Sequence, residues 1–258
     1  MDRSYVIEKA TAYIKEAQTY IKEKVNTEYG IDTKANKDDL VTDVDKSVEA
    51  LFQQRINEEF PGHRLMGEEG SHENIHDLDG VVWILDPIDG TVNFVHMGTN
   101  FAISLGIFEN GKPVYGVVLD VMNDEWFTAE AGQGAYLNGR KLQKLNPVPL
   151  EKALVSFNTG WMLKDEKLRE VVRTVRGTRS YGSAAIELAY VAAGRLDAYI
   201  SFHLAPWDIA GGCILIEETG GIATNYKGEP LDFLEKDTLF AANPAVYKEL
   251  REALKITI

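Results

Sequence analysis

An apolar run that ends in two acidic residues restricts the fold of this chain more than any other feature of its sequence. Residues 81–85 read Val-Val-Trp-Ile-Leu, with Gly80 before them and Asp86-Pro87 after them. A continuous apolar run of this length between glycine and proline is typical of a buried strand. The strand delivers Asp86 at its carboxyl end, and we expect Pro87 to prevent the strand ladder from continuing.

The residues that follow predict a turn rich in oxygen ligands. Asp89 comes three positions after Asp86, so a turn can bring both carboxylates to one point. With the backbone carbonyl of Ile88 they form the kind of hard oxygen set that holds Mg²⁺. Gly90 and Thr91 then offer N–H groups and a hydroxyl where a short helix could begin, which suits a phosphate group. An ordinary Asp/Gly turn in which Asp89 caps a helix explains the same residues.

Three further acidic sites have structural explanations when each is taken alone. Glu68 and Glu69 end a short apolar strand, and in an extended chain only one of them can face a given side. Asp208 begins an apolar helix, where an N-cap aspartate is the ordinary expectation. Thr42 and Asp45 have the spacing of a capping box that starts a helix.

The rest of the chain shows clear helix and strand patterns. Apolar spacing predicts helices over 4–25 and 42–59, and strands are expected at 101–108, 113–121 and 125–130. Asn110-Gly111 between two of these strands predicts a hairpin. After the Gly- and Pro-containing stretch 139–149 we expect strands at 153–157, 197–201, 221–224 and 239–242, and helices at 166–176, 183–193, 209–218 and 245–254. These patterns predict an α+β half at 1–143, with an antiparallel meander, and an α/β half at 144–258.

The charge of the chain limits its partners. Lys and Arg number 27 and Asp and Glu number 40, so the net charge is −13. Such a chain repels nucleic acids and anionic lipid surfaces, and a phosphate-bearing substrate would need bound metal to offset that repulsion. A single cysteine, Cys213, and an N-terminus without an apolar leader lead us to expect a cytoplasmic protein. No P-loop, Gly-x-Ser-x-Gly or His-Glu-x-x-His motif occurs.

Together, the acidic motifs resemble those of inositol monophosphatases over essentially the whole chain. The order of the segments is the same, and the sequences Asp-Pro-Ile-Asp-Gly-Thr and Trp-Asp-Ile-Ala-Gly-Gly are specific signatures of that family. The matching segments are 34–45, 67–69, 86–91, 179–185 and 207–212. The resemblance implies an α+β layered αβαβα sandwich, commonly assembled as a homodimer.

The resemblance also implies a phosphomonoesterase that depends on two or three Mg²⁺ ions, which Mn²⁺ could replace, and that uses metal-activated water. The implied metal ligands are Glu68, Asp86, the Ile88 carbonyl, Asp89 and Asp208. Catalytic roles are implied for Thr91 and Asp45, as the pair that orients and deprotonates the attacking water, and for Glu68 and Lys34. The implied substrate contacts are Asp89, Gly90, Thr91, Gly182, Ser183, Ala184, Ser201 and Asp208.

The implied substrate is a small phosphorylated metabolite whose identity depends on Ser201. Animal members of the family carry a glutamate at this position, where it contacts inositol hydroxyls. Serine should widen that end of the pocket and remove an anion, while His203 and Arg179 could add positive charge. Inositol monophosphate, the 2′-phosphate of NADP and fructose 1,6-bisphosphate therefore all stay open. A dehalogenase-type phosphatase has the wrong aspartate spacing, and a non-catalytic sugar-phosphate-binding protein is the alternative of another class.

Overall fold

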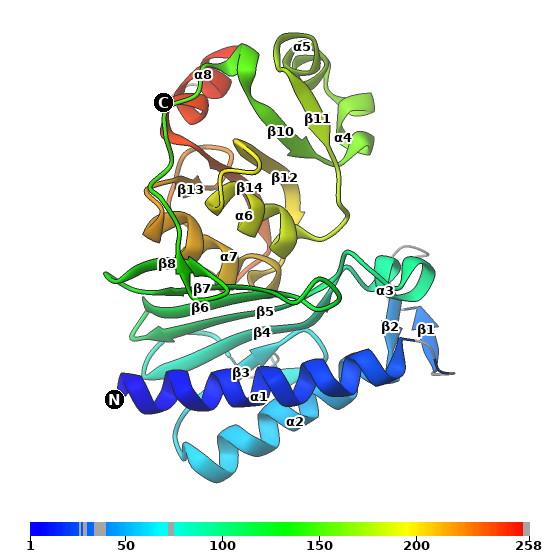
Figure 1. The fold of residues 1–258 in the computed structure, drawn as a ribbon, viewed down its shortest axis with the longest axis vertical. Helices are drawn as coiled ribbons and strands as arrows, with labels where there is room; N and C mark the ends of the chain where they lie inside the picture. Colours follow the sequence, from blue (N-terminus) through cyan, green and yellow to red (C-terminus); the bar gives the residue numbers. More distant parts are fainter. Residues whose placement is uncertain (26, 28–29, 34–39, 72–74, 255–258) are drawn as a thin grey trace.

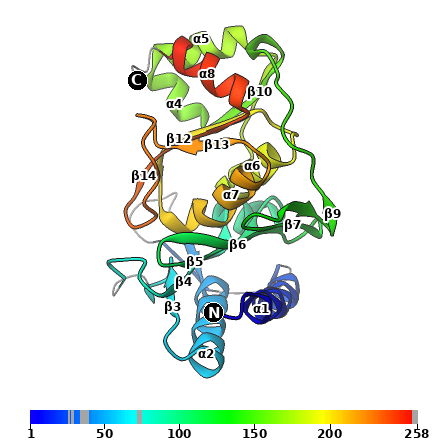
Figure 2. The ribbon, with the colours of Figure 1, turned by 90° about the vertical axis from the view of Figure 1, so that its left-hand side faces the viewer.

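The computed structural model describes residues 1–25, 27, 30–33, 40–71 and 75–254. Two helices, two large sheets and further helices form five layers, α–β–α–β–α (Figures 1 and 2). Outside these layers, β1 (Ile31–Thr33) pairs with β2 (Leu40–Thr42). The first helical layer holds α1 (Arg3–Lys24) and α2 (Asp43–Glu59), as their apolar spacing predicted. The layered α+β sandwich is thus confirmed, while the division at residue 143 stays a prediction. No helix within the described ranges is long and apolar enough to cross a membrane.

The larger sheet covers the first helical layer. Its seven strands follow the chain in spatial order, with β3 and β4 parallel and all later neighbours antiparallel. They are β3 (Arg64–Gly67), β4 (Val81–Asp89), β5 (Ala102–Glu109), β6 (Lys112–Asp120), β7 (Glu125–Glu130), β8 (Gly134–Leu137) and β9 (Arg140–Lys141). The hairpin at Asn110-Gly111 is confirmed, since both residues have positive φ as a tight two-residue turn requires. The short strands β8 and β9 were not predicted.

Helices α6 (Ala184–Ala192) and α7 (Pro206–Glu218) form the middle layer between the two sheets (Figure 2). Both are apolar on nearly every side because one sheet packs on each face of the layer. Gly106, Gly116 and Gly211 allow α7 to lie close against the larger sheet, where an added Cβ would overlap atoms of the opposite element. This close packing fixes the position of α7 relative to the ends of β4 and β5.

The smaller sheet is mixed and lies beyond the middle layer. Its order is β11-β10-β12-β14-β13, with β10 parallel to β11 and β12 and with β14 antiparallel to its neighbours. The strands are β10 (Leu154–Phe157), β11 (Gly177–Arg179), β12 (Ala198–Leu204), β13 (Ile222–Thr224) and β14 (Asp237–Ala242). The outer helices are α4 (Thr159–Lys164), α5 (Glu166–Thr174) and α8 (Pro244–Ala253). A short 3-10 helix, Leu150–Lys152, precedes β10. Of these, α4 and β11 were not predicted.

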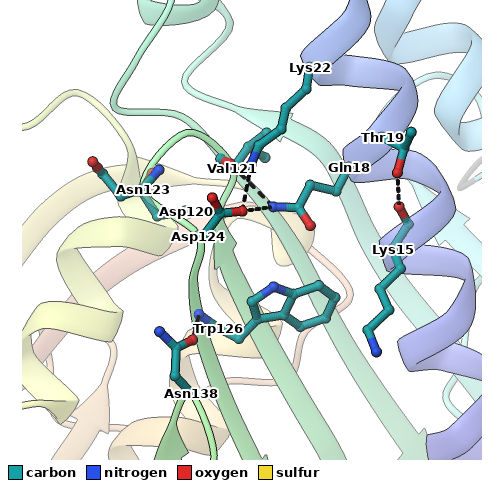
Figure 3. A network of polar contacts seen from close by, with 10 residues as sticks. All are labelled: Lys15, Gln18, Thr19, Lys22, Asp120, Val121, Asn123, Asp124, Trp126 and Asn138. Atoms are coloured by element: carbon teal, nitrogen blue, oxygen red, sulfur yellow. Dashed lines mark hydrogen bonds and ion pairs between the residues drawn. The ribbon is translucent and has the colours of Figure 1, made fainter.

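Helix α1 is held to the sheet by polar contacts near its C-terminal end as well as by its apolar face. Gln18 Nε2 donates to Val121 O (3.3 Å) and to Asp124 Oδ1 (2.7 Å), and Lys22 forms an ion pair with the same Asp124 oxygen (Figure 3). Asp124 lies in the tight turn between β6 and β7 and has positive φ. The contacts therefore connect the first helix to a turn about a hundred residues later.

Candidate active site

A bulge in β4 brings the first two acids together. Asp86 is opposite Ser104 in β5 and Asp89 is opposite Ala102, so the β4 side has one residue more than its partner. In a regular strand, residues three apart face opposite sides, but one extra residue returns them to the same side. The expectation that Pro87 ends the ladder was therefore wrong. Proline lacks an N–H and is tolerated at a bulge, and β4 continues to Asp89.

Asp208 joins these two acids from the middle layer. One carboxylate oxygen from each of Asp86, Asp89 and Asp208 lies within 4.8 Å of the others. The expected N-cap position of Asp208 was wrong, because α7 begins at Pro206 with Ala205 as its cap. Asp208 is instead the third helical residue, and its Oδ2 accepts a hydrogen bond from the Ala205 N–H (2.8 Å). The Asp208 carboxylate therefore closes the start of α7 and faces the end of β4.

Glu68 lies near the cluster, in the turn that follows the neighbouring strand, but it is not one of the three acids whose oxygens meet. Strands β3 and β4 are parallel, with Gly67 opposite Leu85. The next residue along each chain segment is Glu68 after β3 and Asp86 within β4, so these two acids are neighbours across the strands. The negative charge of Glu68 contributes to raising the pKa of Asp86. Glu69 lines a small cavity with Lys46 on the α2 side instead. Both glutamates lie in the turn that follows β3, so the expectation for an extended chain does not apply to them.

The acids of this cluster are crowded: Asp86 and Asp89 are buried, and Asp208 is half-buried. Burial, followed by the nearby charge of Glu68, raises the pKa of Asp86 well above its usual range. Burial raises the pKa of Asp89 to about 7, and burial with the charge of Asp89 raises that of Asp208 to about 8. Neighbouring like charges that cannot all ionise form a site for a cation. Hard carboxylate oxygens, with the Ile88 carbonyl beside them, suit Mg²⁺ or a similar ion.

Asp45 and Thr91 meet at the edge of the cluster. One carboxylate oxygen of Asp45 accepts the Thr42 N–H (2.9 Å), which confirms the capping box at the start of α2. The other oxygen accepts from the Thr91 hydroxyl at 3.4 Å, and that hydroxyl also lies 3.1 Å from Ile88 O. Burial raises the pKa of Asp45 to about 6. The structural and chemical interpretations of Asp45 are therefore compatible, because each uses a different oxygen.

The loop before α6 packs against the turn at Gly90. Gly90 has a φ of 94°, and a Cβ there would lie 3.2 Å from the carbonyl oxygens of Asn100 and Gly182. Asn93 Nδ2 donates to Asn100 O (2.8 Å) and Tyr181 O (2.7 Å), which ties both loops to the short helix α3 (Thr91–Met97). A side chain at residue 90 would therefore collide with both loops.

Ser183 connects that loop directly to the acids. Its hydroxyl donates to Asp89 Oδ2, the same oxygen that accepts the Ala185 N–H (2.7 Å), and it accepts the Ile186 N–H (3.2 Å) as the cap of α6. The segment 182–184 expected from the sequence to contact substrate thus lies beside Asp89.

A cavity of about 690 Å³ extends from this cluster between β12 and α4. Tyr199, Ser201 and His203 alternate along β12, so all three side chains face the cavity. Among the expected substrate contacts, Asp89, Gly182, Ser183, Ala184, Ser201 and Asp208 line it. Arg179, which was expected to add positive charge near the site, is exposed and is not among the lining residues. Lys34 lies outside the described residues.

Seven lining residues were not among the site residues expected from the sequence: Asn158, Trp161, Ser180, Glu187, Tyr199, Leu204 and Lys236. Tyr199 could have been found, because it is two positions before Ser201 in a predicted strand. Trp161 and Lys236 belong to no motif, and only the packing of α4 and β14 against β12 brings them to the cavity. Trp161 contacts Phe202 ring to ring, with centroids 5.2 Å apart.

The arrangement of acids matches a known family. A family model described as the inositol monophosphatase family matches residues 2–257. The chain belongs to this family. As an inositol monophosphatase family member it is a phosphoric monoester hydrolase.

Known relatives are similar over most of their length. Inositol-1-monophosphatase of Bacillus subtilis is 50% identical over 248 residues, 94% of each chain. A solved structure of 2′AMP-bound SaIMPase-II superposes with a TM-score of 0.89 and 39% identity, covering 96% of this chain and 93% of that one. An IMPase/NADP phosphatase solved with Mg²⁺ and phosphate has a TM-score of 0.92 and 28% identity, with 100% and 97% coverage.

Proposed function

We propose that this enzyme is a Mg²⁺-dependent phosphomonoesterase that hydrolyses inositol monophosphate and also phosphomonoesters with larger leaving groups. The observation that carries the proposal is the continuity of the acid cluster with a cavity of about 690 Å³. The cluster alone suits a phosphate with its cations, and the cavity has the size of pockets that take drug-sized ligands. The relatives named for inositol phosphate, 2′AMP and NADP support both halves of the proposal.

Four side chains and one carbonyl would hold the metal. They are Glu68, Asp86, Asp89, Asp208 and the backbone oxygen of Ile88, and we expect two or three Mg²⁺ ions, which Mn²⁺ could replace. When bound, Mg²⁺ supplies positive charge that offsets repulsion between a phosphate dianion and the carboxylates and makes water easier to deprotonate. The IMPase/NADP phosphatase structure contains Mg²⁺ and phosphate, which supports this choice of ion.

The residues of the chain would then position water and phosphate. Thr91 Oγ can pass a proton to the Asp45 oxygen that is not engaged in capping α2. The raised pKa of Asp45 makes its carboxylate a better proton acceptor than an exposed aspartate. Gly90, which has no side chain of its own, would let a phosphate oxygen approach the start of α3. Lys34 remains a proposed contributor to catalysis.

The outer cavity supports a broad choice of leaving group. Ser201 is buried and uncharged, so it adds no negative charge to the wall that faces the leaving group. Trp161 offers an aromatic surface, and His203 and Lys236 can supply positive charge near the mouth. A flat base or a second phosphate finds complementary partners here, whereas a polyol gains less from them.

A panel of phosphomonoesters tests the proposal. Phosphate release from inositol 1-phosphate, 2′-AMP, NADP and fructose 1,6-bisphosphate would be measured with Mg²⁺ and with EDTA. We expect turnover only with the metal, comparable kcat/KM for inositol 1-phosphate and a bulkier ester, and a shift toward inositol phosphate in Ser201→Glu. Wild-type preference for inositol 1-phosphate of about a hundredfold, or about 2.7 kcal/mol, would contradict the broad specificity. The homodimer and the cytoplasmic location both remain predictions. Light scattering would test whether the protein is a homodimer.

A further inference from the structure

The turn that carries Glu68 is held by a glutamate from another element. Glu49 lies in α2 with only 6% of its surface exposed. Its Oε2 accepts the Glu69 N–H (2.6 Å) and its Oε1 accepts the Ser71 N–H (2.9 Å). Both oxygens of one carboxylate thus bind two N–H groups of the turn 67–71, which leaves the turn little freedom to shift.

This contact acts on the backbone directly beside the Glu68 side chain. The N–H of Glu69 belongs to the peptide that joins residues 68 and 69, so the position of this peptide sets the direction in which Glu68 leaves the chain. Gly67 on the other side has no room for a Cβ, which would overlap the Glu49 carboxylate and lie 2.8 Å from Ser71 Oγ. The turn is therefore built around Glu49 on both sides of Glu68.

Glu49 itself does not face the substrate. It lines the small cavity between α2 and the turn, together with Lys46 and Glu69, and is not among the residues that line the large cavity. Its hydrogen bonds reach the acid cluster through the turn, which follows β3 beside Asp86.

We propose that Glu49 is a positioning residue that holds the Glu68 carboxylate beside the acid cluster and thereby sets the affinity of the site for Mg²⁺. The inference rests on the proposed metal-dependent function. Residues that orient metal ligands through hydrogen bonds are expected to change metal affinity about 10–100-fold when they are replaced.

The chain contains a matched control for this contact. Glu218 in α7 also accepts two N–H groups of one turn, from Gly132 (2.6 Å) and Gly134 (2.7 Å), with its two carboxylate oxygens. The chemistry is the same, but the turn joins β7 to β8. Glu218 is ten residues after Asp208 in the helix, or about 15 Å along its axis. Its replacement should lower stability without reaching the metal site.

The test compares Glu49→Gln, Glu49→Asp and Glu218→Gln with wild type. Glutamine has the shape of glutamate but places an NH₂ group against one N–H, so one hydrogen bond is lost and two donors face each other. Mg²⁺ binding to EDTA-stripped protein would be measured by titration calorimetry, and the melting temperature with and without Mg²⁺ by scanning calorimetry. We expect Glu49→Gln to bind Mg²⁺ about 10–100-fold more weakly. Glu218→Gln should bind it like wild type while melting earlier.

Wild-type Mg²⁺ affinity in Glu49→Gln, with a fall in melting temperature like that of Glu218→Gln, would overturn the inference. Should Glu49→Gln fail to fold, Glu49→Asp decides, because it keeps both acceptor oxygens on a shorter side chain and should bind Mg²⁺ with intermediate affinity. Unchanged affinity in that variant overturns the inference equally. If wild type itself binds no Mg²⁺, the proposed function fails. If wild type and Glu49→Gln bind Mg²⁺ equally well, only the inference about Glu49 fails.

Discussion

Replacing Asp89 by asparagine separates electrostatic crowding from hydrogen bonding in the acid cluster. Asp89 Oδ2 accepts hydrogen bonds from Ser183 Oγ and the Ala185 N–H. An asparagine oxygen can accept both, so this anchor of α6 is retained. What disappears is one negative charge among carboxylates whose oxygens lie within 4.8 Å of one another.

The magnitude follows from that spacing. Two unit charges 4.8 Å apart repel by about 0.9 kcal/mol in water and about 3.5 kcal/mol at an effective dielectric of 20. Asp89 has two such neighbours, Asp86 and Asp208, but proton uptake at neutral pH relieves part of the repulsion. At pH 8.5 we therefore expect metal-free Asp89→Asn to be more stable than wild type by about 1–3 kcal/mol. For a chain of this size that is a rise of several degrees in melting temperature.

Scanning calorimetry in EDTA and in Mg²⁺ measures the stability of each variant and its response to the metal. A phosphate-release assay measures turnover. Mg²⁺ should raise the melting temperature of wild type by mass action and that of Asp89→Asn much less, and the variant should have lost turnover. Asp197→Asn is the control, because Asp197 is a half-buried acid outside the cluster that likewise accepts a backbone N–H, from Leu154 (2.8 Å). A fully active Asp89→Asn, or one with the wild-type response to Mg²⁺, would refute the metal assignment.

Three further predictions follow from the same site. Asp45→Asn should cost about 1 kcal/mol or less in stability if Asp45 only caps α2, but should lower kcat roughly 10²–10⁴-fold with little change in KM if it acts through Thr91. Thr91→Ala should lower kcat by a similar factor. If the losses of the two single variants add up in the steady-state rate of the double variant, the two residues do not act as one unit. The pKa values of Asp89 (about 7) and Asp208 (about 8) are higher in the folded protein than in the unfolded chain, so the native state binds more protons. Metal-free stability should therefore fall as the pH rises from about 4 to 8, and denaturant titrations that show the opposite slope would contradict this. Gly90→Ala should lose about 1–3 kcal/mol, measured in urea, because a Cβ is strained at a φ of 94°.

Much of the architecture could be predicted because it depends on local patterns. Helix α1 follows the three- and four-residue spacing of its apolar side chains, and β7 has its predicted bounds. The Asn110-Gly111 turn forms as predicted because a tight two-residue hairpin needs positive φ at both residues. The capping box at Thr42 is also local, since both partners lie within one turn of helix. The set of acids could be named for a similar reason, because each belongs to a short recognisable motif.

Only the tertiary structure decided how those acids meet and what surrounds them. The bulge in β4 depends on pairing with β5, and a strand in isolation would place Asp86 and Asp89 on opposite faces. Asp208 reaches them because the glycines of β5, β6 and α7 let the helix pack closely on the sheet. Trp161, Lys236 and Glu49 have no motif, and their roles arise from contacts with elements distant in the chain. Local sequence encodes backbone conformation over a few residues, whereas the direction and neighbours of a side chain depend on packing between layers.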